Sequence, residues 1–190
     1  MIISHRGNDN HKFKENTKEA IINALSKDYI DGAEFDIRIT KDKRLVLNHS
    51  PIHDGKIIKH SYFKDLKLDS IDSVLKSLKT NKILIIEIKD TDEEVIDLLY
   101  KYIKKYKNLN IYVHTFHKKI ASLFKQKYPN VLVGIILFDL DTDYSIYDFV
   151  NLNYLKYEKI DKLTFIWTVN KKIKKFNSLN VITDKPFLLK

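Results

Sequence analysis

The chain has 190 residues, of which 44% are hydrophobic and 12% aromatic, and it contains no cysteine. A chain of this length supports one packed domain over residues 1–190, and its composition excludes an intrinsically disordered protein. The absence of cysteine excludes disulfides and thiolate metal sites, so any metal must be bound through oxygen or imidazole. The formal net charge of +9 indicates an anionic partner.

Lysine carries most of this charge, because the chain has only three arginines, Arg6, Arg38 and Arg44. Arginine is the side chain that most often reads base edges, so the balance does not favour a nucleic-acid partner. Contact between the lysine-rich segment 101–107 and a membrane surface is at most peripheral. No run approaches the roughly 20 apolar residues of a membrane helix, and no secretory signal is recognisable. We therefore expect a cytoplasmic protein, whose oligomeric state the pattern does not define.

Strand-like runs and helical patterns alternate along the whole chain. In chain order, strands are predicted over residues 2–5, 33–40, 44–49, 83–88, 111–115, 131–138, 148–152, 163–169 and 181–183. Helices are predicted over 16–26, 71–78, 93–106, 118–128 and 171–179. A tight polar turn joins the second and third strands.

Strands that alternate with helices favour a parallel sheet with right-handed crossovers. With about eight strand candidates, closure into a barrel is the natural arrangement, so we predict an α/β fold of the (β/α)8 TIM-barrel class. Such barrels rarely have fewer than about 200 residues. A compact barrel with shortened connections is therefore expected, most of all between Asp141 and Asp161.

Polar residues interrupt the strands near their carboxyl ends, where the active sites of such barrels lie. Glu34 and Asp36 are two positions apart on one strand, so both carboxylates face the same side of the sheet. Glu87 and Lys89 share a face at the end of another, nearly apolar strand. Burial of carboxylates in apolar strands is unfavourable unless they are paired or bind a metal. The three carboxylates therefore predict a divalent cation, and all-oxygen ligands favour Mg²⁺ or Ca²⁺ over zinc.

Two histidines end strands of the same series. His5 ends the first strand and is followed by Arg6, and His49 ends the third. Beside a cation, two imidazoles can serve as general acid and general base at neutral pH. Arg6 and Lys89 would then neutralise phosphate oxygens. This combination of groups is typical of phosphoryl chemistry.

Seven motifs follow one another in order along the chain. They are His5-Arg6-Gly7, Glu15-Asn16-Thr17, Glu34-Phe35-Asp36, His49, Glu87-Ile88-Lys89, Trp167-Thr168-Val169-Asn170 and Ile182-Thr183-Asp184-Lys185-Pro186. This ordered set resembles the glycerophosphodiester phosphodiesterase family, which are phospholipase C-like phosphodiesterases with a TIM-barrel fold. The resemblance implies one divalent cation, Mg²⁺ or Ca²⁺, on Glu34, Asp36 and Glu87, acid/base roles for His5 and His49, phosphate binding by Arg6 and Lys89, and a pocket-wall or substrate-contact role for Trp167.

The resemblance also implies a phosphoric diester hydrolase of lipid or glycerol metabolism. It would convert a small glycerophosphodiester to glycerol 3-phosphate and an alcohol. Attack by metal-activated water and attack by a substrate hydroxyl, which gives a cyclic phosphate, both remain open. Two alternatives are a lysophospholipase D-like enzyme that acts on lipid diesters and a degenerate barrel that binds phosphate-containing ligands without turnover.

The sequence departs from the family pattern after the second histidine. Ser50 follows His49, where the family usually has aspartate, and Asp54 could replace that aspartate. His53 is the alternative to His49 at this position. The segment from 51 to 70 is also short, which would leave a more open site.

Three residues in or near the motifs also have a structural interpretation. His114 lies inside a predicted strand and is expected to take a hydrogen-bonded, structural role that could line the barrel. Glu15 is as well suited to starting the following helix as to binding a partner. Gly7 adjoins a motif histidine and arginine, which indicates a backbone requirement there.

Overall fold

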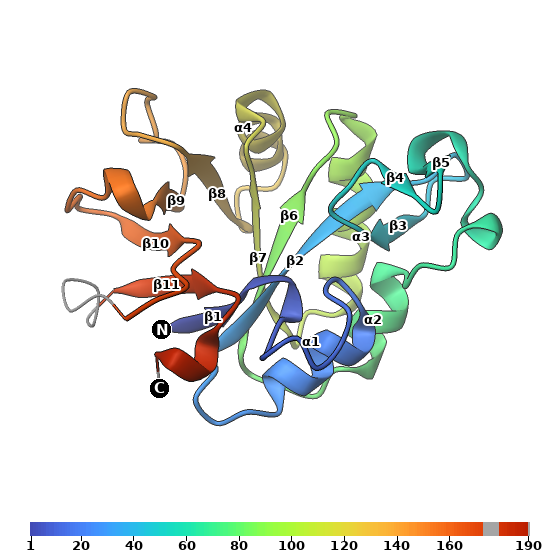
Figure 1. The fold of residues 1–190 in the computed structure, drawn as a ribbon. Helices are drawn as coiled ribbons and strands as arrows, with labels where there is room; N and C mark the ends of the chain where they lie inside the picture. Colours follow the sequence, from blue (N-terminus) through green and yellow to red (C-terminus); the bar gives the residue numbers. More distant parts are fainter. Residues whose placement is uncertain (173–178, 190) are drawn as a thin grey trace.

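The computed structural model of the chain describes residues 1–172 and 179–189, and in this part eight parallel strands form a closed barrel (Figure 1). The ring closes because the first strand pairs both with the second and with the last. In ring order the strands are β1 (Ile2–Ser4), β2 (Gly32–Ile39), β6 (Ile83–Ile88), β7 (Asn110–Thr115), β8 (Leu132–Leu137), β9 (Phe149–Asn153), β10 (Leu163–Trp167) and β11 (Asn180–Thr183). The predicted TIM-barrel class is confirmed.

The α-helices of the described residues cover only part of the barrel, as Figure 1 shows. They are α1 (Lys18–Leu25), α2 (Ile71–Ser77), α3 (Glu94–Lys105) and α4 (Lys118–Lys127), and they follow β1, the β2 hairpin, β6 and β7. Short 3-10 turns occur at η1 (His5–Gly7), η2 (Ile58–His60), η3 (Phe63–Asp65), η4 (Tyr154–Lys156) and η6 (Pro186–Leu188). The links from β8 to β10 contain no α-helix, so the connections are shortened as predicted.

Two predictions from the sequence concern helices: one over residues 171–179, and the absence of a membrane-spanning helix. The helix predicted over 171–179 falls mostly on residues 173–178, which lie outside the described residues. Within the described residues, no helix combines the length and the apolar character needed to cross a lipid bilayer.

One predicted strand lies outside the ring. Residues 44–49 contain β3 (Leu45–Leu47), which pairs antiparallel with β2 and so extends the sheet beyond the barrel. A small hairpin of β4 (Ile52–His53) and β5 (Lys56–Ile57) follows it. The ring has eight strands because it includes β9, which lies in the segment where the sequence pattern was weakest.

Alternating side chains divide the core into an outer and an inner layer. Phe35 and Ile37 of β2 pack with Ile21 of α1 in the outer layer. The intervening Glu34 and Asp36 face the inside, because successive side chains of a strand point to opposite faces. The inner floor is apolar and consists of Ile3, Ile83, Ile85, Phe149, Phe165 and Ile182. Polar side chains occupy the layer above this floor, toward the carboxyl ends of the strands.

Candidate active site

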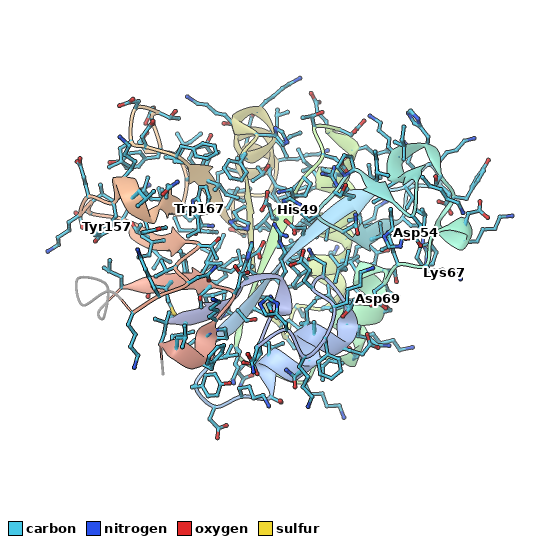
Figure 2. All side chains as sticks on the ribbon, viewed as in Figure 1. His49, Asp54, Lys67, Asp69, Tyr157 and Trp167 are labelled. Atoms are coloured by element: carbon cyan, nitrogen blue, oxygen red, sulfur yellow. The ribbon has the colours of Figure 1, made fainter. Side chains whose placement is uncertain are left out.

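One cavity at the carboxyl ends of the strands brings together seven of the eight predicted site residues. Its volume is about 230 Å³. Figure 2 labels two residues of its wall: His49, which follows β3 outside the ring, and Trp167 at the end of the ring strand β10. The predicted residues in the wall are His5, Arg6, Glu34, His49, Glu87, Lys89 and Trp167. The eighth, Asp36, is buried beside this wall.

His5 is held by a hydrogen-bond chain from the last strands of the barrel. Its Nδ1 lies 2.6 Å from Oδ1 of Asp184, and Nδ2 of Asn170 donates to Oδ2 of Asp184 at 2.7 Å. Nε2 of His5 lies 3.9 Å from Oε2 of Glu34, so this nitrogen faces the cavity. Burial lowers the pKa of His5, but the hydrogen bond with Asp184 and the charge of Glu34 outweigh burial and raise it above its usual value. Asp184 stands in a motif noted in the sequence, but its partnership with His5 was not predicted.

Arg6 is fixed by three acidic residues around an unusual backbone turn. Its φ is 54°, and its backbone N–H donates to Oε2 of Glu34 at 3.1 Å. Its guanidinium donates to Glu15 at 2.7 Å and lies 3.3 Å from Oδ2 of Asp36. At Gly7, with φ +69°, a Cβ would lie 2.8 Å from the backbone of α1. Only glycine fits there, which explains the backbone requirement expected from the sequence.

Asp36 lies among donors and positive charges. Asn16 donates from Nδ2 to Oδ2 of Asp36 at 2.7 Å and accepts from the Asp36 backbone N–H at 2.9 Å. Nζ of Lys89 is 3.6 Å from Oδ1 of Asp36 and 2.7 Å from Oε1 of Glu87. The carboxylate of Asp36 is therefore paired within the protein, and its role as a metal ligand stays a prediction.

Glu34, Glu87 and His114 form a buried cluster that was not assembled from the sequence. One ligand atom from each side chain lies within 4.8 Å of the others. Nε2 of His114 lies 3.6 Å from Oε1 of Glu34, which is too far for a hydrogen bond. His114 lines the cavity and pairs with the side chain of Asn151, in agreement with the hydrogen-bonded position expected from the sequence. Its acidic neighbours were not predicted. The strand alternation could have placed it inside the barrel, since the adjacent Val113 packs in the outer layer.

Buried polar atoms without hydrogen-bond partners gather at this site. Among the described residues they are Arg6 Nε, Glu34 Oε1, Asp36 Oδ1, His114 Nε2 and Asn151 Oδ1. Leaving such a group unsatisfied costs roughly 1–3 kcal/mol. A divalent cation would satisfy several of these atoms at once, so the residues present fit a bound metal.

The carboxylates of this cluster have pKa values displaced in opposite directions. Burial and the charges of Asp36 and Glu34 raise the pKa of Glu87 to about 8. Burial would also raise the pKa of Glu34, but the imidazoles of His114 and His5 outweigh it and lower that pKa to about 2. The cluster thus crowds acidic groups together, and a cation would relieve their mutual repulsion.

His49 is more exposed than His5 and follows β3. Its backbone carbonyl accepts from Arg38 at 2.7 and 3.0 Å. Burial and the positive charge of Lys89 lower the pKa of His49 below its usual value. Asp54, considered as a replacement for the aspartate missing after His49, lies instead 3.5 Å from Nε2 of His53. His53 is absent from the cavity wall, so His49 is the histidine that this segment brings to the site.

Trp167 belongs to an aromatic wall formed with Phe116 and Phe138. The three ring centroids lie 5.4 to 5.7 Å apart. Phe138 is 61% exposed and Phe116 is 36% exposed, so the wall reaches the mouth of the cavity. Nζ of Lys89 lies 5.8 Å from the centroid of Phe116. The wall can therefore contact apolar parts of a ligand whose anionic part lies near Lys89.

Comparison with known proteins relates this site to one family. Residues 5–96 match the model of the glycerophosphoryl diester phosphodiesterase family. The chain is also similar to YhdW of Bacillus subtilis (strain 168), a provisionally named glycerophosphodiester phosphodiesterase. The two are 23% identical over 239 residues, an alignment that covers 100% of this chain and 96% of that protein.

Three solved structures share the barrel. A glycerophosphodiester phosphodiesterase from Parabacteroides distasonis ATCC 8503 has a TM-score of 0.81 at 20% identity, over 98% of this chain and 93% of that one. One from Thermotoga maritima has a TM-score of 0.77 at 21% identity, over 97% and 94%. An Oleispira antarctica phosphodiesterase, in complex with the product sn-glycerol-3-phosphate, has a TM-score of 0.88 at 15% identity, over 100% and 94%. At these identities the likeness establishes a shared fold.

Proposed function

We propose that this chain, of which residues 5–96 match the family model, is a glycerophosphodiester phosphodiesterase that hydrolyses a glycerophosphodiester to glycerol 3-phosphate and an alcohol. One observation carries this proposal: three imidazoles, two cationic side chains and buried carboxylates meet at one cavity of about 230 Å³. Such a set can bind an anionic diester and stabilise the charge that develops when its phosphorus is attacked. In this proposal residues 1–190 act as a single catalytic domain.

Arg6 and Lys89 are the proposed phosphate-binding groups. Arg6 is held by Glu15 at 2.7 Å, and Lys89 is held by Glu87 at 2.7 Å. These pairs restrain both cations before substrate arrives, so less conformational freedom is lost on binding. Trp167 would contact the carbon skeleton of the glycerol or of the alcohol.

His5 and His49 are proposed to move the two protons of the reaction. One imidazole accepts the proton of the attacking hydroxyl, and the other donates a proton to the alcohol oxygen as its bond to phosphorus breaks. If water attacks, glycerol 3-phosphate forms directly. If a glycerol hydroxyl of the substrate attacks, a cyclic phosphate forms first and water then opens it. In both routes one proton is accepted and one is donated in each displacement.

A divalent cation is part of the proposed site. Glu34 and Glu87 would hold it, and the family resemblance adds Asp36 as a third ligand with Mg²⁺ or Ca²⁺ as the ion. When bound, the cation supplies positive charge beside the phosphate oxygens. Because Asp36 is already paired with Arg6 and Lys89, the third position is also open to another side chain.

The test is release of glycerol 3-phosphate from glycerophosphocholine and glycerophosphoethanolamine, with Mg²⁺, Ca²⁺, Mn²⁺ or a chelator. We expect chelator-sensitive product that falls at least about 100-fold in His5→Ala and in His49→Ala, the usual size of an acid/base contribution. His60→Ala changes an exposed histidine outside the cavity wall and should retain activity. Binding of glycerol 3-phosphate without turnover under every condition would refute hydrolysis and support the binding-only barrel.

A lipid diester is a second candidate substrate because the aromatic wall reaches the mouth of the cavity. Phe138, which is 61% exposed there, could pack against the acyl chain of a lysophospholipid. If so, Phe138→Ala should reduce turnover of lysophosphatidylcholine and leave turnover of glycerophosphocholine nearly unchanged. Equal loss with both substrates would exclude a specific role of Phe138 toward the lipid chain.

A further inference from the structure

We propose that His114 is a direct ligand of the cation, and that the site consequently prefers a divalent ion of the first transition row, such as Mn²⁺ or Zn²⁺, over Ca²⁺. The proposal deepens the proposed hydrolysis, on which it rests for the use of the cation. It adds His114 to the ligand set expected from the sequence.

The position of His114 supports direct coordination. His114 on β7 is the register partner of Glu87 on the adjacent β6, and both are buried. Nε2 of His114 has no hydrogen-bond partner and lies 3.6 Å from Oε1 of Glu34, which also has none. Two unsatisfied buried atoms that face each other at this distance can share one ion as ligands.

Asn151 on β9 supplies the contact that orients this imidazole. Its side-chain amide pairs with Nδ1 of His114, while its Oδ1 has no hydrogen-bond partner. The oxygen and nitrogen of an asparagine amide have nearly the same shape, so the amide can be turned by half a rotation. Oδ1 then accepts from Nδ1–H, and the lone pair of the ring is on Nε2, toward the carboxylates. Contacts of this type commonly fix the ring of a metal-bound histidine.

Asp36 differs from Glu34 in the groups that face its carboxylate. Its Oδ2 lies 2.7 Å from Nδ2 of Asn16 and 3.3 Å from Nε of Arg6. Its Oδ1 has no hydrogen-bond partner, as Oε1 of Glu34 has none, but it lies 3.6 Å from the positively charged Nζ of Lys89, whereas Oε1 of Glu34 lies 3.6 Å from an imidazole nitrogen. Because Lys89 also lies 2.7 Å from Oε1 of Glu87, its pairing does not exclude Asp36 from the ligand set that His114 joins.

An imidazole nitrogen changes which ion the site prefers. Ca²⁺ and Mg²⁺ are hard ions that take oxygen ligands. Imidazole suits transition ions, whose affinity for a given site rises from Mn²⁺ toward Cu²⁺. We therefore expect the wild type to bind Mn²⁺ at least about tenfold more tightly than Ca²⁺.

Mn²⁺ is the probe for the test, because its electron spin-echo modulation detects a coordinated ¹⁴N directly. The full chain is stripped with chelator and loaded with Mn²⁺ alone. We expect nitrogen modulation in the wild type, loss of it in His114→Gln, and retention in the control His60→Gln. The Kd for Mn²⁺ should rise at least about tenfold in His114→Gln, as for other changes close to a metal.

A second variant covers the case in which His114→Gln does not fold. His5, His49 and His114 are the histidines of the cavity wall, so the double variant His5→Gln/His49→Gln should keep the nitrogen modulation. Loss of modulation in this double variant, Mn²⁺ bound by the wild type without nitrogen coupling, or no cation binding would each overturn the proposal.

Assays of glycerol 3-phosphate release on the same Mn²⁺-loaded samples separate the two proposals. Nitrogen-coordinated Mn²⁺ without product would refute the hydrolysis and leave the role of His114 standing. Product from a site with oxygen ligands alone would refute the role of His114 and leave the hydrolysis standing.

Discussion

Asp184 joins the last strand of the barrel to the carboxyl end of the first through its 2.6 Å contact with His5. Asp184 does not line the cavity, so it acts on substrate only through the imidazole. Its own carboxylate is oriented by Asn170 at 2.7 Å. In the proposed mechanism Asp184 is therefore a positioning residue, which keeps Nε2 of His5 directed at the cavity.

Asp184→Asn should lower kcat by roughly 10- to 100-fold and leave KM nearly unchanged, because the amide keeps a polar contact with the ring but loses the charge that stabilises the imidazolium. The charge of Asp184 raises the pKa of His5. Removing this charge should lower the pKa of His5. The part of the pH profile of kcat/KM that depends on His5 should therefore move to lower pH. The measurement is steady-state kinetics across pH 5 to 9.

Asp54→Asn is the matched control for this change. Asp54 lies 3.5 Å from His53, so it forms a looser, more exposed histidine–aspartate pair away from the cavity. This control should leave kcat and the pH profile unaltered. A loss in KM alone, or an unmoved pH profile in Asp184→Asn, would contradict the positioning role.

The predictable part of the site is the part that local patterns define. Glu34 and Asp36 were placed on one face because their spacing matches the strand pleat. The pairing of His5 with Asp184 spans 179 positions in the chain, and no local pattern reports such a contact. The same is true of His114, whose acidic neighbours come from two other strands.

At the scale of elements, β8 and β9 meet at a glycine beneath the site. A Cβ added to Gly134 of β8 would meet the ring of Phe149 on β9 at 2.4 Å. Phe149 belongs to the apolar floor, and its ring centroid lies 5.8 Å from that of Phe165 and 6.4 Å from that of His114. The close packing of these strands therefore requires glycine at this position.

Gly134→Ala should destabilise the fold by about 1–3 kcal/mol, the usual effect of overpacking a dense core. For a chain of this size that lowers the melting temperature by roughly 2–12 °C. Phe149→Leu removes the ring that the new methyl group would contact. The double variant should therefore lose less stability than the sum of the losses in the two single variants. Strictly additive effects in thermal unfolding would show that the two residues do not interact.

Hydrophobic alternation predicted where the strands and helices lie along the chain, but it predicted their arrangement in space only in part. The strand predicted over 44–49 pairs antiparallel with β2 outside the ring, because its hairpin turn returns the chain in the opposite direction. The weak pattern over 148–152 proved to be the barrel strand β9. Which strands enter the ring depends on closure between β1 and β11, and a local pattern does not report closure.

At the scale of the whole molecule, the site depends on both halves of the barrel. The carboxylates come from β2 and β6, whereas Asn151 and Asp184 come from β9 and the end of β11. β1 pairs with β11 at Ile2 and Val181, so the first and last strands of the barrel meet beside His5. A ligand that binds this assembled site stabilises the closed barrel relative to the unfolded chain.

Cation binding should therefore raise the melting temperature. At a free concentration of 100 times its Kd, a cation that binds only the folded chain contributes about 2.7 kcal/mol, which corresponds to a rise of roughly 5–11 °C for a chain of this size. Differential scanning calorimetry with Mn²⁺ and with chelator measures the difference. Glu34→Gln/Glu87→Gln should abolish the rise, because the two carboxylates are shared by both candidate ligand sets.

Glu94→Gln is the control, since Glu94 pairs with Lys43 on the surface and both side chains are about half exposed. It should keep the full rise with Mn²⁺. An equal rise in the double variant and the control would place the cation elsewhere on the molecule, and no rise in the wild type would exclude a cation bound to the folded barrel.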